Sequence, residues 1–400
     1  MTRLQDQLNR AQQIIMRQVT QVLPEGRLAE LLALKRPLRV KLGFDPTGGK
    51  IHIGRAIQLW KLREFQDLGH QVVMIVGDFT ALIGDASDKL QRRPVLTPEQ
   101  IAANLKQYRQ QVGLILDLDK VEWRHNSEWL VALKPGELVR LARQVTVSQM
   151  LARHNFKERF TGGSEIGLDE LLYPLFQGYD SVAVRADVEI GGTDQLFNLQ
   201  VGRTLQRLYG QPAQVALVNQ MLNGLDGRKM STSWGNVVNL VDAPQEQFGK
   251  LMSMADAEIE PYAFLAARMT DEEIAALKKL HPKTAKAQVA GKIVGLYHGP
   301  QKAAAAREEF ERVFKAGGQP NEMPEFKMAP GRYSIIDLLI NANLAGSKAE
   351  VKRLISEQGI FIDGAAAQTA QQEIELKSNS AIVLQRGKRK FVKIMSENSK

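Results

Sequence analysis

The sequence contains no cysteine, and this absence excludes disulfide bonds, cysteine-ligated zinc sites and thiol nucleophiles together. Its six histidines are scattered and form no His-x-x-x-His pair, so no protein-bound metal is expected. No run approaches the roughly 18 consecutive apolar residues that a membrane helix needs. The polar N-terminus lacks the apolar core of a secretion signal. We therefore expect a cytoplasmic protein with no membrane partner.

The chain has 400 residues, of which 44% are hydrophobic, and this is the composition of an ordinary globular protein. A single hydrophobic core rarely grows to this length, so two or three domains are expected. The 53 basic residues outnumber the 44 acidic residues, which gives a net charge of +9. This excess favours association with a polyanion such as nucleic acid, but it does not determine the fold.

The first 242 residues carry two strand–helix–strand patterns, which predict parallel strands with helices packed across them. In each pattern short β-branched runs flank an amphipathic helix that stops at a glycine, Gly69 or Gly210. The expected elements are a strand at 38–44, a helix at 52–68 and a strand at 72–77, then a strand at 184–190, a helix at 194–209 and a strand at 214–222. With a helical insert at about 97–180, these halves predict an α/β domain with a doubly wound, Rossmann-like parallel sheet over residues 1–242.

The remainder of the chain divides by composition into three parts. Residues 243–316 read as helical throughout, which predicts an all-α domain. Residues 317–332 are rich in glycine and proline, as is typical of a linker. Residues 333–400 combine two short helices with strand-like runs and a hairpin at 381–394, which predicts a small α+β module.

Two segments carry residues suited to binding phosphate. The first lies between the strand at 38–44 and the next helix, where free backbone N–H groups and the helix dipole favour anions. Thr47 and His52 can donate hydrogen bonds to phosphate oxygens there, and Gly54 lets a nucleotide approach the backbone. The second is the glycine-flanked loop around Lys229, whose basic and hydroxyl side chains can close over a triphosphate.

Together the two segments resemble the HIGH and KMSKS motifs of class I aminoacyl-tRNA synthetases, as His52-Ile53-Gly54-Arg55 and Lys229-Met230-Ser231-Thr232-Ser233. Four further stretches narrow the resemblance to the tyrosyl-tRNA synthetase family, in its shorter bacterial branch, over nearly the whole chain. These stretches are Gly43-Phe44-Asp45-Pro46-Thr47, Gly84-Asp85, Tyr173-x-x-x-Gln177-x-x-Asp180 and Gly191-Gly192-Thr193-Asp194-Gln195.

The spacing of Tyr173, Gln177 and Asp180 places a phenol, an amide and a carboxylate on one helix face, which suits a small polar pocket better than a core. Pro174 leaves the limits of that helix open. The resemblance implies that Asp85, Tyr173 and Gln177 hold the amino group of tyrosine. It also implies that Asp180 accepts the phenolic hydrogen and that Gln195 helps place the carboxylate.

The resemblance further implies that ATP is a substrate and that Mg²⁺ accompanies it. The expected catalytic residues are Thr47, His52 and Lys229. The expected ATP-binding residues are Gly43, Asp45, Gly54, Arg55, Gly192, Asp194, Met230, Ser231, Thr232 and Ser233. Three positions depart from the family pattern. Arg55 replaces the second histidine of HIGH, Thr232 replaces the second lysine of KMSKS, and Lys41 stands where longer bacterial enzymes have a tyrosine.

The C-terminal module resembles a small RNA-binding domain named after a ribosomal small-subunit protein. Its basic residues gather on one predicted helix and at the hairpin turn, which suits an RNA backbone. They are Lys348, Lys352, Arg353, Arg386, Lys388, Arg389 and Lys390.

The resemblance implies a tyrosine–tRNA ligase whose 243–316 helices receive the anticodon arm of its tRNA, and which forms a homodimer through the helical insert. Two alternatives stay open. A tryptophan-specific relative has less use for Asp180, because an indole offers one N–H and no hydroxyl. A non-catalytic RNA-binding paralogue is favoured by Arg55 and Thr232, but it has no use for a complete amino-acid pocket.

Overall fold

The computed structural model describes residues 2–34, 36–85, 97–230, 234–316, 323–387 and 390–396. The chain divides into two compact units, residues 1–243 with 250–297 and residues 244–249 with 298–400. Five predicted site residues lie outside the described residues, namely Ser231, Thr232, Ser233, Lys388 and Arg389.

The first unit is built on a six-stranded sheet with the order β1-β6-β5-β2-β3-β4. Neighbouring strands are parallel except β1 and β6, which pair antiparallel. The strands are β1 (Val19–Leu23), β2 (Arg39–Phe44), β3 (Gln71–Val76), β4 (Val121–His125), β5 (Val188–Gly192) and β6 (Val215–Asn219). The predicted α/β class with a parallel sheet is confirmed.

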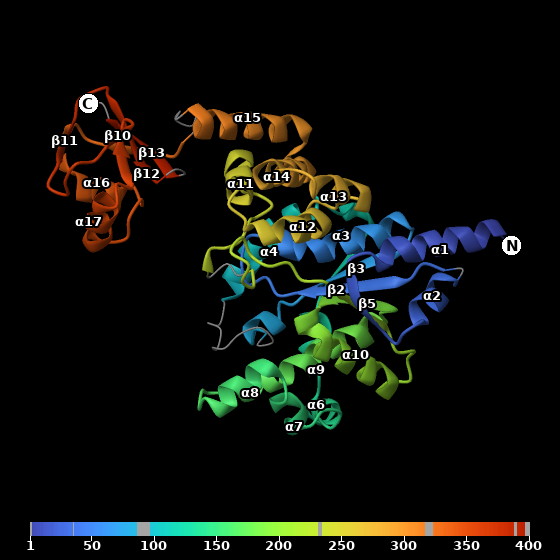
Figure 1. Cartoon of the computed structure of the whole chain (residues 1–400). Coiled ribbons are helices and arrows are strands. Elements are labelled where there is room, and N and C mark those ends of the chain that lie inside the picture. Colours follow the sequence, from blue (N-terminus) through green and yellow to red (C-terminus); the bar gives the residue numbers. More distant parts are fainter. Residues whose placement is uncertain are drawn as a thin grey trace. The chain divides into compact units, whose positions relative to one another are not determined.

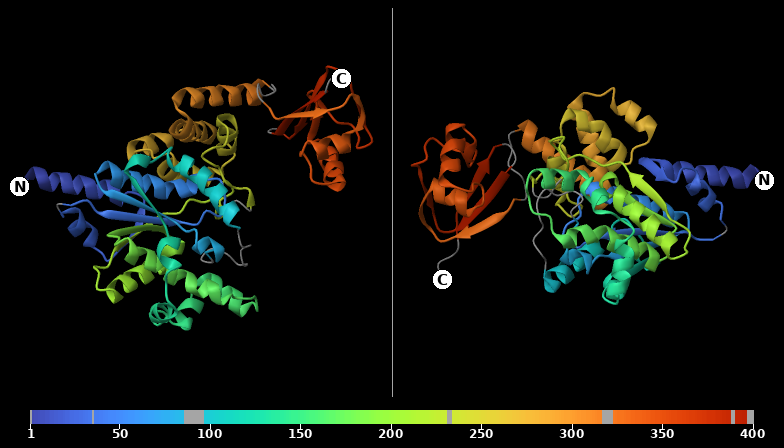
Figure 2. Two further views of the ribbon diagram at one scale, coloured as in Figure 1. Left: turned by 180° about the vertical axis from the view of Figure 1, so that it is seen from behind. Right: turned by 90° about the horizontal axis from the view of Figure 1, so that it is seen from below.

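Helices cover both faces of this sheet, so the central strands are buried on both sides. Helix α3 (Ile53–Asp67) connects β2 to β3 on one face, and α9 (Leu168–Ala183) and α10 (Leu196–Leu208) lie on the other (Figures 1 and 2). The chain therefore leaves β2 and β5, which are neighbours, toward opposite faces. Such a switch point opens a crevice beyond the carboxyl ends of the two strands, where ligands of open α/β sheets bind.

The segment expected to be a helical insert contains a strand of the central sheet as well as helices. Strand β4 pairs parallel with β3, with Met74 opposite Trp123. Its sequence, VEWRH, is half-exposed and carries no apolar run, which explains why composition did not predict it. The helices of the segment are α4 (Pro98–Val112), α5 (Ser127–Leu130), α6 (Pro135–Ala142), α7 (Val147–Leu151), α8 (His154–Thr161) and α9.

One predicted strand has different bounds in the structure, and one strand of the sheet was not predicted. The expected strand at 184–190 begins only at Val188, because α9 continues to Ala183 and Val184 caps it. Strand β1 was not predicted; it pairs with β6 at the edge of the sheet. It follows helix α1 (Thr2–Met16) and precedes α2 (Arg27–Leu32).

The helices after residue 243 do not form one separate unit, unlike the expected 243–316 domain. They are α11 (Pro244–Leu251), α12 (Ile259–Pro261), α13 (Asp271–Leu277), α14 (Pro282–His298) and α15 (Pro300–Ala316). Residues 250–297 belong to the first unit. The indole N–H of Trp60 on α3 donates to the Tyr297 hydroxyl at 3.2 Å, and Arg268 donates to Glu64 at 2.7 Å. These contacts attach the segment to α3.

The second unit contains the small α+β module, with a five-stranded sheet in the order β10-β9-β12-β13-β7. The strands of this sheet are β7 (Glu325–Met328), β9 (Ile360–Ile362), β10 (Ala365–Ala366), β12 (Ala381–Arg386) and β13 (Lys390–Ser396). Strands β8 (Gly331–Ser334) and β11 (Glu373–Leu376) pair in a separate two-stranded sheet, and the helices of the module are α16 (Ile335–Asn341) and α17 (Lys348–Ser356). Because β7 pairs with β13, residues 325–328 of the expected linker belong to the module.

Candidate active site

A cavity of about 580 Å³ lies at the switch point of the first sheet. It is lined by the residues that follow β2 and β5, by the start of α3, by α9 and by residues 229–230. All predicted catalytic, ATP-binding and tyrosine-binding residues that the structure describes line it. They are Gly43, Asp45, Thr47, His52, Gly54, Arg55, Asp85, Tyr173, Gln177, Asp180, Gly192, Asp194, Gln195, Lys229 and Met230. Residues far apart in the sequence therefore meet in one place.

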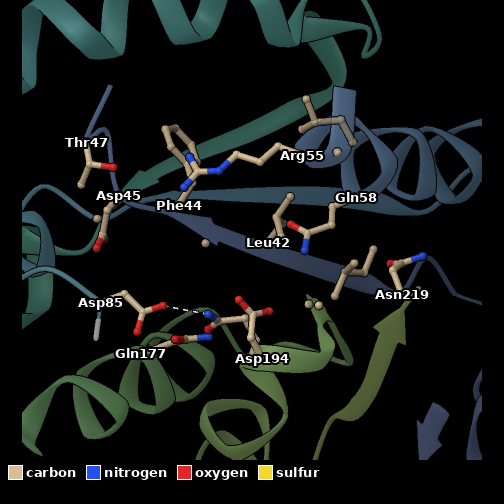
Figure 3. A pocket seen from close by; sticks show the side chains of 18 of the residues that line it. Leu42, Phe44, Asp45, Thr47, Arg55, Gln58, Asp85, Gln177, Asp194 and Asn219 are labelled. Carbon is tan, nitrogen blue, oxygen red and sulfur yellow. Dashed lines mark hydrogen bonds between the residues drawn. The ribbon is translucent and has the colours of Figure 1, made fainter. Parts of the chain in front are cut away.

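One helix carries the predicted tyrosine pocket. Helix α9 tolerates Pro174 in its first half and continues to Ala183, which places Tyr173, Gln177 and Asp180 along one side of the cavity. In Figure 3 the side chains of Asp85, Gln177 and Asp194 lie below the cavity, opposite Arg55 and Gln58 of α3.

The hydroxyl of Tyr173 donates a hydrogen bond to Asp45 Oδ2 at 3.0 Å, and Asp45 Oδ1 accepts one from Thr80 at 2.7 Å. Burial and the negative charge of Asp45 raise the pKa of the Tyr173 phenol well above its usual value. The phenol therefore keeps its proton, and that proton is directed to Asp45. The lone pairs of its oxygen remain to accept hydrogen bonds from a ligand.

Hydrogen bonds between amide side chains connect Asp85 to Gln177 across the predicted tyrosine pocket. Gln195 Nε2 donates to Asp85 Oδ2 at 2.7 Å, the bond drawn as a dashed line in Figure 3. Asn198 Nδ2 donates to Gln177 Oε1 at 2.8 Å and to Gln195 Oε1 at 3.0 Å. Asn198 is fully buried on α10 and was not predicted. The sequence offered one indication of its role: Asn198 follows Gln195 by three residues, on the helix that starts at the site.

Asp180 lies at the deep end of the cavity and is only 3% exposed. Its carboxylate accepts hydrogen bonds from Trp129 Nε1 at 2.8 Å and from Asn126 Nδ2 at 3.5 Å. Burial raises the pKa of Asp180 to about 7, although the positive charge of Lys41 and both hydrogen bonds oppose the shift, and the charge of Glu189 adds to it. Asn126 and Trp129 were not predicted as site residues.

The raised pKa of Asp180 predicts that binding of a phenol in this pocket depends on pH. If a phenolic O–H must donate to an ionised Asp180, binding below pH 7 has to release a proton, so affinity for tyrosine should rise as the pH increases toward about 7 and level off above it. We expect roughly a tenfold gain in affinity per pH unit well below this value. Titration calorimetry from pH 5.5 to 8.5 measures it. In Asp180→Asn the dependence should disappear, and a pH dependence that persists in this variant would contradict the assignment.

His52 caps the N-terminus of α3, where its Nδ1 accepts a hydrogen bond from the backbone N–H of Arg55 at 3.3 Å. Burial, together with the positive charge of Arg55, lowers the pKa of His52 to about 3. The ring is therefore neutral at physiological pH. Because Nδ1 accepts, Nε2 carries the hydrogen and is the atom that can donate to a ligand.

The glycine of the HIGH-like motif packs closely against two side chains of the site. A Cβ atom on Gly54 would lie 3.0 Å from Met230 Sδ and 3.1 Å from His52 Nδ1. These contacts are tighter than ordinary van der Waals contacts, so a larger residue here would make the Met230 or His52 side chain shift by a few tenths of an ångström.

Two cations of the predicted ATP site reach the cavity. Lys229 Nζ lies 3.7 Å from Asp194 Oδ2, and the side chain of Arg55 extends from α3 toward Phe44 (Figure 3). The neighbouring Arg228 is directed elsewhere, since its Nε donates to Asp226 at 2.8 Å and its guanidinium lies 5.0 Å from the centre of the Trp234 ring. Lys229 is therefore the basic side chain that this loop brings to the cavity within the described residues.

The predicted RNA-binding residues fall into two groups. Lys348, Lys352 and Arg353 are exposed on α17, and Lys390 is exposed at the start of β13. Arg386 is instead bound within the module, where it donates to the carbonyl of Leu344 at 2.6 Å and lies 2.8 Å from Glu350. Arg386 therefore contributes to the packing of the module.

The described part of the chain contains neither a candidate metal site nor a candidate membrane-spanning helix. Nowhere in it do three or more acidic, histidine or cysteine side chains gather as potential metal ligands. None of its helices is both long enough and apolar enough to span a membrane.

Comparison with known proteins agrees with this geometry. The family model described as "tRNA synthetases class I (W and Y)" matches residues 33–315, and the model described as "Tyrosine--tRNA ligase SYY-like C-terminal domain" matches residues 315–394. The tyrosine–tRNA ligase of Moorella thermoacetica is 42% identical over 403 aligned residues, covering 98% of this chain and 97% of that protein. The tyrosine–tRNA ligase of Oleidesulfovibrio alaskensis is 44% identical over 389 residues, covering 95% of this chain and 97% of that protein.

Solved structures agree on the fold. The tyrosyl-tRNA synthetase of Archaeoglobus fulgidus, solved with L-tyrosine, superposes with a TM-score of 0.61 at 22% identity, covering 75% of this chain and 99% of that one. That of Aeropyrum pernix gives a TM-score of 0.60 at 20% identity, covering 77% and 98%. With the family models and the curated relatives, these findings show that the chain belongs to the tyrosine–tRNA ligase family of class I aminoacyl-tRNA synthetases.

Proposed function

We propose that the cavity at the switch point activates tyrosine with ATP and that the residues lining it act in the roles that the family resemblance implies. The tyrosine carboxylate attacks the α-phosphate of ATP, a new phosphorus–oxygen bond forms, and pyrophosphate leaves. The 3′-terminal ribose of the tRNA then takes the tyrosyl group and releases AMP. The observation that carries this proposal is that a complete polar pocket and both phosphate-binding segments line one cavity.

At the amino-acid end, the ammonium group of tyrosine meets three oxygen acceptors, from Asp85, Tyr173 and Gln177. The proton of Tyr173 is directed to Asp45, which supports its role as an acceptor. Asp180 accepts the phenolic hydrogen at the deep end. Gln195, whose amide donates to Asp85, helps place the carboxylate.

At the phosphate end, Thr47, His52 and Lys229 stabilise the charge that develops on the phosphates. No covalent enzyme intermediate is needed, so catalysis consists of positioning and of preorganised charge. ATP enters as its Mg²⁺ complex, with the ion on the phosphate oxygens. Gly192, the last residue of β5, and Asp194, in the turn that follows, meet the ribose. The remaining predicted ATP contacts come from Gly43, Asp45, Gly54, Arg55, Met230, Ser231, Thr232 and Ser233.

A crystal structure with a non-hydrolysable tyrosyl-adenylate analogue tests these roles. The ammonium group should lie within about 3.2 Å of Asp85, Tyr173 and Gln177, and the phenolic oxygen should lie equally close to Asp180. An analogue bound with its phenol away from Asp180 would contradict the assignment of the deep end.

The basic side chains of α17 support binding of tRNA by the C-terminal module. In the full-length chain, the triple variant Lys348→Ala, Lys352→Ala and Arg353→Ala should leave tyrosine activation unchanged. Its affinity for tRNA should fall, and the slope of log affinity against log salt should flatten by about one for each phosphate that is no longer bound. Filter binding at several salt concentrations measures both. Lys377→Ala, which changes a basic residue outside α17, serves as the control. Equal slopes in all three proteins would show that the basic residues of α17 do not bind the tRNA backbone.

Three further proposals follow from membership of the family. The helices after residue 243 receive the anticodon arm. The chain forms a homodimer through the helices of the insert, several of which expose large apolar side chains, such as Phe160 at 64% and Leu168 at 75%. The reaction takes place in the cytoplasm. Sedimentation across a range of protein concentrations tests the dimer.

A further inference from the structure

A buried ion pair lies beside the proposed tyrosine pocket, and the proposed mechanism does not use it. Lys41 on β2 and Glu189 on β5 are directly opposite each other in the register of the two parallel strands at the switch point. Their side chains are 0% and 1% exposed, and Lys41 Nζ lies 3.0 Å from Glu189 Oε1. Removing two charges from water is costly unless every polar atom is paired. The partners of this pair are therefore informative.

The ammonium group of Lys41 has three N–H donors, and each has an acceptor. Besides Glu189, they contact the backbone carbonyl of Gln177 at 2.9 Å and the hydroxyl of Ser181 at 2.8 Å. The hydroxyl of Ser181 in turn donates a hydrogen bond to Glu189 Oε2 at 3.0 Å. Both the backbone and the hydroxyl belong to α9, so Lys41 fixes the part of this helix that faces the cavity.

The carboxylate of Glu189 is equally saturated. Its Oε1 accepts from Lys41 and from Gln177 Nε2 at 3.2 Å, and its Oε2 accepts from Ser181 and from Gln214 Nε2. A carboxylate has about four lone-pair positions and no donor. The group of Gln177 that faces Glu189 must therefore be its NH₂.

This constraint decides which end of the Gln177 amide is available to a ligand. With the NH₂ held by Glu189, Oε1 is on the other side, where it accepts one hydrogen bond from Asn198 and keeps its second lone pair. An ammonium group has only donors and needs an oxygen. A reversed amide would present N–H groups to that cation and repel it.

We propose that the Lys41–Glu189 pair is a positioning device that holds the Gln177 amide with its oxygen available to the cavity, and so makes the pocket require an α-ammonium group. The pair itself does not touch the substrate. The inference rests on the proposed role of Gln177 in binding tyrosine.

The test compares tyrosine with 3-(4-hydroxyphenyl)propionate, which keeps the phenol and the carboxylate but lacks the ammonium group. In Glu189→Gln the new amide accepts either orientation of Gln177. Calorimetry should then show that tyrosine binds roughly tenfold or more weakly, which is the range of one hydrogen bond to a charged group. The affinity for 3-(4-hydroxyphenyl)propionate should change by less than about twofold. Equal weakening of both ligands would overturn the proposal, because a merely structural loss does not distinguish them.

Two variants make the result specific. Glu122→Gln removes a glutamate from another ion pair of the same sheet, with Arg39, and should change neither affinity. In a Gln177→Ala background, Glu189→Gln should lose its effect on tyrosine binding. If the tenfold loss persists there, the pair does not act through Gln177.

Glu189→Gln leaves Lys41 buried without its counter-ion, and an uncompensated buried charge can by itself unfold a protein. The double variant Lys41→Met/Glu189→Gln buries no lone charge and should show the same selective loss of tyrosine binding. Unaltered selectivity in the folded double variant would overturn the inference. A parent protein that binds both ligands equally would instead contradict the proposed role of Gln177, and with it the proposed amino-acid pocket.

Discussion

Replacing Asp180 with alanine is expected to lower the preference for tyrosine over phenylalanine steeply. The carboxylate is buried and accepts hydrogen bonds from Trp129 and Asn126, which hold it in place, and its proposed role is to receive the phenolic hydrogen of tyrosine. Phenylalanine would leave this acceptor desolvated and unpaired. Sites that bind a hydroxyl reject the analogue without it by roughly 10⁴–10⁵, a range for which tyrosyl-tRNA synthetase is itself the established example, so this magnitude is taken from such enzymes.

The measurement is kcat/KM for activation of both amino acids in the parent and in the variant. Asp180→Ala should lower the value for tyrosine by roughly 10- to 150-fold, as expected when a hydrogen bond to a charged group is removed, and should change the value for phenylalanine only a few-fold. Asp169→Ala, at the opposite end of α9, is the matched control. If both amino acids lose activity by the same factor, Asp180 supports the fold or the general chemistry and does not determine specificity.

Lys229→Ala should slow the activation step by roughly 10²–10³, the usual effect of removing one preorganised charge donor from an active site. Its ammonium group lines the cavity beside Asp194. Because Thr232 stands where the family has its second lysine, the sequence of this loop offers little to replace it. The affinity for tyrosine should stay within about threefold, since the role proposed for Lys229 is at the phosphate end.

Single-turnover formation of tyrosyl-adenylate measures this rate without interference from product release. Arg228→Ala is a sharp control, because Arg228 is the adjacent basic residue but is bound to Asp226 and lies against Trp234. It should have a much smaller effect. A Lys229→Ala rate within a few-fold of the parent, or equal losses in the two variants, would assign the main phosphate contact to another residue.

The central sheet could be predicted from the sequence where its strands are buried on both faces. Strands β2, β3 and β6 read as short apolar runs because helices cover both of their sides. Strand β4 could not be predicted, since it is half-exposed and its polar residues interrupt any apolar run. Periodicity therefore revealed the middle of the sheet better than its edges.

In the candidate site, too, some features could be predicted from the sequence and others could not. Tyr173, Gln177 and Asp180 could be grouped because helical spacing is a local property. The Lys41–Glu189 pair could not, because these residues meet only through the pairing of β2 with β5, and strand order is a property of the whole fold. The same holds for Asn126 and Trp129, which reach Asp180 from the segment after β4. Local patterns predicted the residues on one element, and the contacts between elements required the structure.

Pyrophosphate exchange with each of the twenty amino acids, measured without tRNA, tests the central claim most directly. The reaction needs a complete amino-acid pocket and both phosphate-binding segments, but no RNA. We expect tyrosine alone to support rapid exchange, with tryptophan and phenylalanine far below it. Exchange by the folded protein that is no faster with tyrosine than without any amino acid would contradict the account, and would favour an RNA-binding paralogue that has lost the chemistry.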